Sequence, residues 1–142
     1  MNKKVSIITV NYNGVTDTCE MIESLKRHEN YPYELIVVDN GSASLNDYTL
    51  LKEKYPDAKV IRNDINLGFA EGNNIGVKQA TGDYLFFLNN DTIITRPILE
   101  ILVKRLDSDE KIGCVSPKTT FWPQNNKLQY AGATPMSYIT LR

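Results

Sequence analysis

Short runs of β-branched and apolar residues alternate with segments of helical periodicity along the first hundred residues of the chain. Residues 5–10 (VSIITV) are nearly continuous in apolar character, as expected of a central parallel strand that is covered on both faces. This alternation predicts an α/β fold with right-handed crossovers and a mainly parallel sheet that has helices on both faces. The remaining expected strands are 35–38, 59–62, 84–88 and 112–115, and 128–131 is expected to be extended. A first helix is expected after the N-cap candidate Thr16, up to the stop signals at Asn30 and Pro32, and further helices at 45–55, 69–80 and 97–106.

Composition excludes several classes of function. The chain has 142 residues, with 16 Lys plus Arg against 17 Asp plus Glu. Without a long basic stripe the main driving force for binding nucleic acid is lost, so we expect no nucleic-acid partner. No apolar run approaches the roughly 20 residues that cross a bilayer, and residues 1–4 lead into a strand rather than a signal core. We therefore expect no transmembrane segment and a cytoplasmic protein, with peripheral attachment to the inner face of the membrane left open.

Amide-rich polar loops follow four of the expected strands. They are Asn-Tyr-Asn at 11–13, Asp-Asn-Gly-Ser at 39–42, Asn-Asp-Ile-Asn at 63–66 and Asn-Asn-Asp-Thr at 89–92. Ligands of parallel sheets bind outside the carboxyl ends of the strands, so these loops are the expected ligand site. Tyr12 could stack there on a base or sugar ring, or anchor the core or an interface instead.

Two carboxylates in these loops each have two interpretations. Asp39 could accept hydrogen bonds from a base or a ribose, or it could be a turn or helix-capping residue. Asp91, with the amides of Asn89 and Asn90, offers one anionic and two neutral oxygens to a divalent cation whose other ligands are diphosphate oxygens and water. Alternatively, Asp91 or Thr92 caps the helix that follows.

Residues 66–76 (NLGFAEGNNIG) place glycines four apart, at Gly68, Gly72 and Gly76. On a helix these glycines share one face, where they permit close approach to the sheet or to a ligand at a cost of up to about 1 kcal/mol each relative to alanine. Asn73 and Asn74 beside them could hydrogen-bond a nucleotide. Tight packing of the helix on the sheet is the alternative.

Four motifs, in this order and at this spacing, resemble those of the family-2 glycosyltransferases. They are VSIITVNYN at 5–13, IVVDNGS at 36–42, NLGFAEGNNIG at 66–76 and FLNND at 87–91. The resemblance covers roughly residues 5–115 and is greatest to a bacterial branch with rhamnosyltransferase-like members. It implies a Rossmann-like GT-A fold that binds a nucleoside-diphosphate sugar, with dTDP- or UDP-sugars as expected donors. It further implies inverting sugar transfer to a glycan or lipid-linked acceptor hydroxyl, in bacterial surface polysaccharide synthesis.

The same resemblance implies roles for individual residues. Asp39 accepts from the base, and the loop at 11–13 lines the nucleotide. The segment 89–91 stands at the family's Asp-X-Asp motif, with Asp91 on Mn²⁺ or Mg²⁺ and Asn89 near the ribose. Asn89 replaces the first carboxylate of that motif, which removes one negative charge from the metal site. The full expected site comprises the nucleotide-binding residues Thr9, Asn11, Tyr12, Asn13, Asp39, Asn66, Gly68, Asn73, Asn74, Asn89 and Asn90, and the metal ligand Asp91.

The family's catalytic base lies in an acceptor half, well beyond the Asp-X-Asp motif. No carboxylate before Arg142 matches it, so we expect the base beyond Arg142 and the fold to be interrupted before the acceptor half. Residues 1–117 are expected to form the donor-binding domain and residues 118–142 to begin the acceptor side, with the oligomeric state open. Two alternatives are a nucleotidyltransferase, which normally has a glycine-rich basic loop where this chain has Asn-Tyr-Asn-Gly, and a non-catalytic nucleotide-sugar-binding or interaction module.

Overall fold

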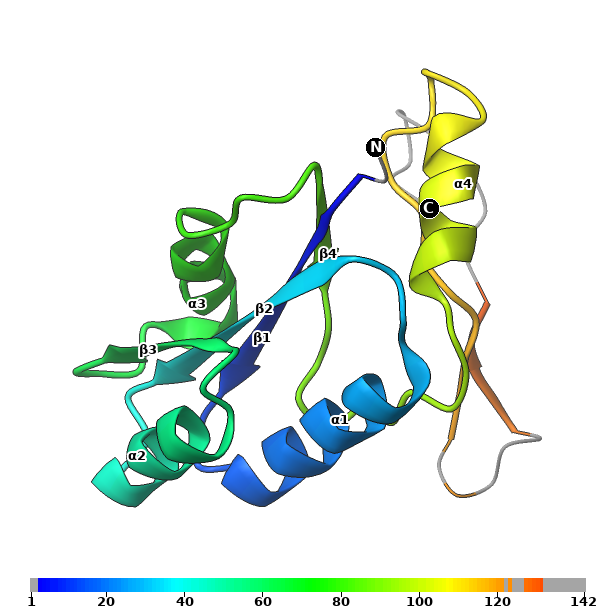
Figure 1. Cartoon of the computed structure of the whole chain (residues 1–142). Helices are drawn as coiled ribbons and strands as arrows, with labels where there is room; N and C mark the ends of the chain where they lie inside the picture. Colours follow the sequence, from blue (N-terminus) through cyan, green and yellow to red (C-terminus); the bar gives the residue numbers. More distant parts are fainter. Residues whose placement is uncertain (1–2, 122, 124–126, 132–142) are drawn as a thin grey trace, which may run out of the picture. The chain divides into compact units, whose positions relative to one another are not determined.

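A four-stranded sheet forms the centre of the computed structural model, which describes residues 3–121, 123 and 127–131. Its strands are β1 (Val5–Asn11), β2 (Tyr33–Asn40), β3 (Lys59–Asn63) and β4 (Tyr84–Phe87), in the order β3-β2-β1-β4 (Figure 1). Every neighbouring pair in this sheet is parallel. The predicted parallel α/β sheet is therefore confirmed.

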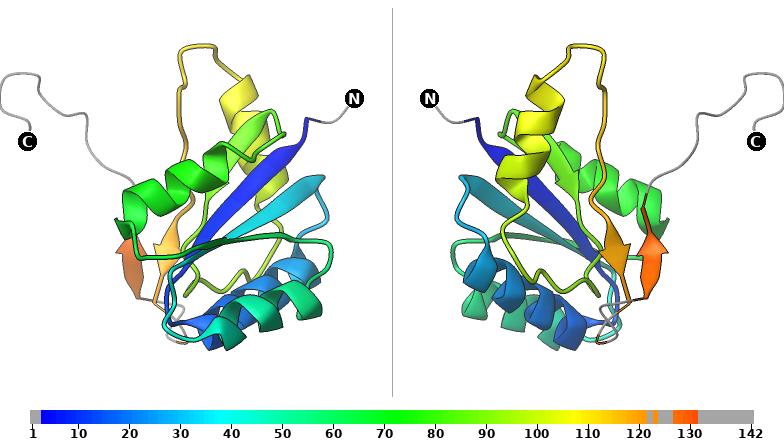
Figure 2. Two further views of the ribbon diagram at one scale, coloured as in Figure 1. Left: turned by 90° about the vertical axis from the view of Figure 1, so that its left-hand side faces the viewer. Right: turned by 90° about the vertical axis from the view of Figure 1, so that its right-hand side faces the viewer.

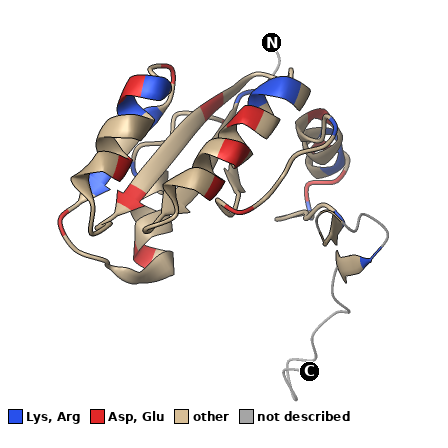
Figure 3. Cartoon of the chain, turned by 90° about the horizontal axis from the view of Figure 1, so that it is seen from below, with Lys and Arg blue, Asp and Glu red and all other residues tan. Residues whose placement is uncertain are grey.

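Helices cover both faces of the sheet, as the alternation of elements predicts. Helices α1 (Val15–His28) and α2 (Leu45–Lys54) lie together on one face, and α3 (Gly68–Val77) lies on the other (Figures 1 and 2). In α1 the acidic residues come first and the basic residues lie in the last turn, whereas α3 has an acidic residue and no Lys or Arg (Figure 3). None of the helices in the described residues is both long and apolar enough to cross a membrane.

The core on the α3 face is built around Ile8, Ile36 and Val38, which are fully buried. Burial of each such side chain stabilises the fold by about 1.5–3 kcal/mol. A Cβ on Gly76 would lie only 2.4 Å from Ile8 Cγ2, so α3 approaches β1 more closely than any side chain at this position would permit. A Cβ on Gly72 would likewise lie 3.1 Å from a methyl group of Val10. The spacing of these two glycines therefore serves packing on the sheet.

One strand prediction is confirmed and another is wrong. The expected strand at 84–88 forms β4, which is an edge of the described sheet, and Leu85 and Phe87 are 45% and 52% exposed there. The expected strand at 112–115 is not formed, and these residues are irregular. A short apolar run becomes a strand only where a neighbouring strand supplies its hydrogen bonds.

The chain divides into two compact units, Met1–Leu99 and Glu100–Arg142. The first unit contains the parallel sheet with α1, α2 and α3. Helix α4 (Leu99–Asp107) begins at the last residue of the first unit. The second unit also contains an antiparallel pair, β5 (Thr119–Thr120) and β6 (Leu128–Tyr130), which agrees with the extended segment expected at 128–131.

Candidate functional site

The order of the strands locates the point where a ligand should bind. From β1 the chain crosses through α1 to β2 on one side, whereas from β3 it crosses through α3 to β4 on the other side of β1. The connections thus change direction between β1 and β4. In open α/β sheets ligands bind at such a switch point, outside the carboxyl ends of the strands. The loops that follow β1 and β4 contain the expected site residues 11–13 and 89–91.

Three side chains from neighbouring strands stand in a row at this carboxyl edge. Asn11 is paired in register with Asp39, and Asp39 with Arg62, so their side chains share the face that α1 and α2 cover. Asn11 Nδ2 donates to Asp39 Oδ1 at 3.0 Å, and Arg62 Nη1 forms an ion pair with Asp39 Oδ2. Asn11 and Asp39 have no exposed surface, and the Arg62 side chain is 20% exposed.

Asp39 is neither a loop residue nor a helix cap. It is the next-to-last residue of β2, and the N-cap of α2 is Ser44, whose Oγ accepts from the Asn46 backbone N–H at 3.1 Å. The capping alternative is therefore wrong. Asp39 also differs from the open loop carboxylate that the sequence predicts, because it is fully buried and has three partners: Asn11, Arg62 and the Ser42 hydroxyl.

Ser42 connects the loops that follow β1 and β2. Its Oγ accepts from the Asn13 backbone N–H at 2.9 Å and from Asn11 Nδ2 at 3.2 Å, while Asn13 Oδ1 accepts from the Ala43 N–H at 2.8 Å. Asn13 has a φ of 53°, a left-handed conformation that asparagine tolerates better than most residues. Tyr12, between these anchored residues, is 50% exposed, so its ring is accessible for stacking.

Arg62 and Ser42 were missed as site residues by the sequence reasoning. Arg62 Nη2 also donates to the Ser42 carbonyl at 3.0 Å, so one guanidinium contacts both the carboxylate and the turn that follows it. The available signal in the sequence was a cation, Arg62, at the end of the expected strand 59–62, and a carboxylate just after the expected strand 35–38. This signal predicts an ion pair only if the two strands are neighbours in the sheet, and the sequence does not give the strand order.

A second polar cluster lies at the same edge on the α3 face. Asn40 Nδ2 donates to Asn66 Oδ1 at 2.9 Å, and Asn63 Nδ2 donates to Asn40 Oδ1 at 2.8 Å. Asn66 Oδ1 also accepts from the Gly68 N–H at 2.8 Å. This cluster fixes the segment that enters α3. Asn66 and Gly68, expected to contact the nucleotide, therefore use these polar groups within the protein.

Asn73 and Asn74 lie apart from the row formed by Asn11, Asp39 and Arg62, whereas Thr9 is next to it. Asn73 donates to the Phe69 carbonyl at 2.9 Å and Asn74 to Glu71 at 3.1 Å, both within α3 and across the sheet from Asp39. Thr9 is fully buried inside β1, and its hydroxyl has no hydrogen-bond partner within the described residues. The structure thus places Asn73 and Asn74 away from the row, and Thr9 beneath the surface on the same strand face as Asn11.

The loop after β4 presents an exposed carboxylate. A turn closes it, in which the Thr92 N–H donates to the Asn89 carbonyl at 3.2 Å. Asn90 Nδ2 donates to Thr18 Oγ1 at 3.1 Å, which ties the loop to α1. Asp91 is exposed, with no hydrogen bond or ion pair from its side chain to any other residue of the described chain.

Asp91 and Thr92 do not cap α4, which begins only at Leu99. The backbone N–H groups of Ile98 and Leu99 donate instead to Glu29 Oε2, at 2.9 and 3.0 Å. The Glu29 carboxylate also accepts from the N–H groups of Asn30 and Tyr31. Burial raises the pKa of Glu29, but these four backbone donors outweigh it and lower the pKa below its usual value.

The loop at 89–91 fits a cation that is shared with a ligand. No group of three or more His, Cys, Asp and Glu residues within the described ranges could hold a metal ion alone. One exposed carboxylate with flanking amides suits Mn²⁺ or Mg²⁺ when diphosphate oxygens and water complete the coordination.

Glu34 lies at the opposite, amino-terminal edge of the sheet. Its carboxylate accepts from the Ser6 hydroxyl and from the N–H and hydroxyl of Thr81, and it forms a 3.3 Å ion pair with Lys4. Burial raises the pKa of Glu34, but these contacts outweigh it and lower the pKa to about 2. This cluster fastens the segment before β4 to β1 and β2.

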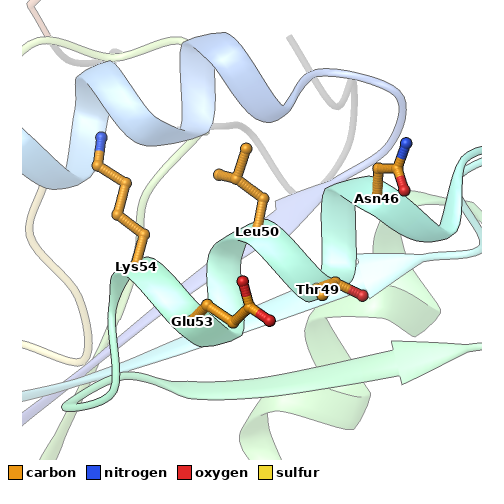
Figure 4. A pocket seen from close by; sticks show the side chains of 5 residues that line it. All are labelled: Asn46, Thr49, Leu50, Glu53 and Lys54. Atoms are coloured by element: carbon orange, nitrogen blue, oxygen red, sulfur yellow. The ribbon is translucent and has the colours of Figure 1, made fainter.

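An open depression on α2 does not coincide with either polar cluster (Figure 4). A small-molecule site usually brings convergent polar groups from several elements together. Here one helix supplies every lining residue: Asn46, Thr49, Leu50, Glu53 and Lys54.

Residues 6–137 match the sequence model of Glycosyl transferase family 2. The chain belongs to this family. Among curated relatives, the uncharacterized glycosyltransferase YwdF of Bacillus subtilis is 33% identical over 132 residues, which cover 88% of this chain and 49% of YwdF. The O-antigen biosynthesis protein RfbC of Myxococcus xanthus is 34% identical over 134 residues, covering 91% of this chain and 10% of RfbC.

Solved structures of other glycosyltransferases share the fold. S. aureus TarS 1-349, crystallised alone and with UDP, gives a TM-score of 0.65 at 25% identity; the match covers 84% of this chain and about two fifths of TarS. The mannosyltransferase PcManGT of Pyrobaculum calidifontis, in complex with GDP-Man and Mn²⁺, gives 0.58 at 22% identity over 66% of this chain and 29% of PcManGT. The expected GT-A type fold is confirmed. The family-2 chain spans about half or less of the length of these relatives, and the rhamnosyltransferase-like branch stays a prediction.

Proposed function

We propose that this chain is the donor-binding part of an inverting glycosyltransferase that moves a sugar from a nucleoside diphosphate to an acceptor hydroxyl. The observation that carries this proposal is the row of Asn11, Asp39 and Arg62 at the carboxyl edge of the sheet, the edge that is also followed by the loop with the exposed carboxylate of Asp91. TarS binds UDP and PcManGT binds GDP-Man with Mn²⁺, which supports a nucleotide-sugar ligand. The relative RfbC, named for O-antigen biosynthesis, supports a role in bacterial surface polysaccharides.

Asp39 and Arg62 together are suited to the base. A carboxylate accepts from a ring N–H, and an adjacent guanidinium donates to the neighbouring carbonyl. Uracil and thymine offer this pair of groups, so UDP- or dTDP-sugars are the proposed donors. Since Asp39 is fully buried, base contact requires a shift of the partly exposed Arg62 side chain. Tyr12 is then placed to stack on the base or ribose.

Asp91 is the proposed protein ligand of Mn²⁺ or Mg²⁺, and Asn89 lies beside the ribose. A divalent cation neutralises the charge that develops on the nucleoside-diphosphate leaving group. Restoring the second carboxylate of the family motif with Asn89→Asp should tighten the cation. The base that deprotonates a glycan or lipid-linked acceptor is proposed to lie beyond Arg142, as the family resemblance implies.

Titration calorimetry with UDP, dTDP and GDP, with and without Mn²⁺, tests the proposal. Wild-type chain should bind at least one diphosphate more tightly with Mn²⁺, and Asp91→Asn should remove this enhancement. Asp64→Asn is the matched control, because Asp64 is an exposed carboxylate in the loop after β3. The proposal would be overturned if the chain bound none of the three nucleotides. Binding without hydrolysis or transfer of a donor sugar, in the chain and in a longer form alike, would favour the non-catalytic module.

A further inference from the structure

An unbroken series of hydrogen bonds joins the carboxylate proposed to meet the base with the loop proposed to hold the cation. Asn90 Nδ2 donates to Thr18 Oγ1 at 3.1 Å, and Thr18 Oγ1 donates to Asn11 Oδ1 at 2.9 Å. Asn11 Nδ2 then donates to Asp39 Oδ1 at 3.0 Å. The loop after β4, helix α1 and the ends of β1 and β2 each contribute to this series.

Thr18 is the central member and has no role in the sequence prediction. Thr18, Asn11 and Asp39 have no exposed surface. Removing the hydrogen-bond partner of one of these polar groups would therefore destabilise the fold, because water cannot replace the lost partner. The Thr18 hydroxyl also lies 3.0 Å from the Gly14 carbonyl, the ordinary contact of a helical threonine with the preceding turn. Its contacts with Asn11 and Asn90 go beyond that local role.

Helix α1 supports the segment that follows β4 at further points. Ser24 Oγ accepts from the Ile94 N–H at 2.9 Å, and Glu29 Oε2 accepts from the N–H groups of Ile98 and Leu99. Among the described residues of α1, Thr18 is the one with a hydrogen bond to the 89–91 loop itself. The Thr18 hydroxyl thus links this loop, through Asn11, to Asp39.

We propose that Thr18 is a positioning residue that makes binding of the nucleotide base and of the divalent cation cooperative. This inference rests on the proposed function. The base and the diphosphate belong to one ligand, and the distance between them is limited by its covalent structure. Asp39 can therefore contact the base while the 89–91 loop holds the cation on the diphosphate only if the two are correctly spaced. A hydroxyl that bonds to both sides holds this spacing before the ligand arrives, which reduces the cost of ordering the site.

The test compares Thr18→Val, which keeps the shape and removes the hydroxyl, with Thr18→Ser, which keeps the hydroxyl. The measured quantity is the ratio of the UDP dissociation constants without and with Mn²⁺. Thr18→Val should lower this ratio about five-fold, which corresponds to the loss of one hydrogen bond. Thr18→Ser should keep the wild-type ratio. Thr49→Val is the matched control, because the Thr49 hydroxyl makes the same kind of helical contact, 3.2 Å from the Leu45 carbonyl. An unchanged ratio in Thr18→Val, even with lower thermal stability, would overturn the inference.

A second arm needs no nucleotide. In a chain that is otherwise wild type, Asn90→Ala should shift the NMR signal of the Asn11 side-chain amide. The same substitution should cause no shift of this signal in a chain that carries Thr18→Val. If Asn90→Ala leaves the Asn11 signal unchanged, Thr18 does not connect the two sides and the inference fails. If wild-type chain binds neither UDP, dTDP nor GDP, the proposed function fails, while this arm still reports whether the hydrogen bonds couple Asn90 to Asn11.

Discussion

Removing the charge of Asp39 should lower both the free energy of unfolding and the affinity for the nucleotide, and the two effects should be separable. In Asp39→Asn the amide oxygen can still accept from Asn11 and Ser42, but the amide nitrogen replaces the oxygen that pairs with Arg62. Breaking a buried ion pair on one side costs about 3–5 kcal/mol. Because the Arg62 side chain is 20% exposed, solvent offsets part of this, and we expect a loss of about 2–4 kcal/mol in the free energy of unfolding.

The double variant Asp39→Asn/Arg62→Met separates the two effects. Without the guanidinium no unpaired charge remains, so the double variant should recover about 1–2 kcal/mol relative to Asp39→Asn alone. UDP affinity should not recover with it. A hydrogen bond to a charged group contributes about 1.5–3 kcal/mol, so loss of the carboxylate should weaken binding by roughly ten- to hundred-fold in Asp39→Asn. The double variant should bind at least as weakly, because it also lacks the Arg62 guanidinium that is proposed to donate to the base.

Urea unfolding followed by circular dichroism gives the stabilities, and calorimetry at a temperature where each variant is folded gives the UDP affinities. A loss below about 1 kcal/mol in Asp39→Asn would show that the ion pair does not support the fold. Recovery of UDP affinity in the double variant would show that Asp39 acts only through stability and does not meet the base.

Three further changes have defined outcomes. Asp91→Asn should leave thermal stability nearly unchanged while abolishing the Mn²⁺ enhancement of UDP affinity, because the Asp91 side chain is exposed and without a partner in the described chain. Gly76→Ala should lower the free energy of unfolding by about 1–2 kcal/mol in urea melts, since overpacking against Ile8 exceeds the gain in helix propensity. Glu34 should make stability fall as the pH drops from about 4.5 towards 2, because its lowered pKa means that its stabilising contribution is complete above the ordinary value of 4.5 and is lost on protonation. Glu34→Gln should flatten this part of an acid unfolding curve.

Each of these expectations has a result that would contradict it. Marked thermal destabilisation by Asp91→Asn would indicate a structural turn residue. For Gly76→Ala, the cost should shrink when Ile8 is also replaced by alanine, and an unchanged cost would exclude the proposed clash. An acid unfolding curve that is the same for wild type and Glu34→Gln would show that the Glu34 contacts with Ser6, Thr81 and Lys4 contribute no net stability.

Much of the fold follows from local patterns that the sequence states directly. The β-branched runs at 5–10 and 35–38 predict the strands because their apolar faces need cover on both sides. The apolar run at 112–115 also predicts a strand, but these residues are irregular in the structure. A strand needs a pairing partner, and the local pattern of residues does not specify one. Leu85 and Phe87 show the same limit, because an apolar edge strand and an apolar central strand have the same local pattern.

The sequence indicates which edge of the sheet carries the candidate site, but not the contacts within it. Polar loops follow the ends of the expected strands, and the Asp39 carboxylate lies at that carboxyl edge in the structure. Its partner Arg62 depends on β3 pairing with β2, and Thr18 depends on the path of the loop after β4 along α1. Contacts such as these, between residues that are distant in the sequence, cannot be predicted from residue type or spacing alone.

The central claim is that a nucleoside diphosphate and a divalent cation bind between the loops after β1 and β4. Paramagnetic Mn²⁺ broadens the NMR signals of nearby amides, so it reports directly where the cation sits. With UDP present, broadening should be strongest for residues 89–91 and extend to 11–13, and it should weaken sharply when UDP is omitted. Broadening centred on Glu53 and the depression on α2, or broadening independent of UDP, would contradict the account.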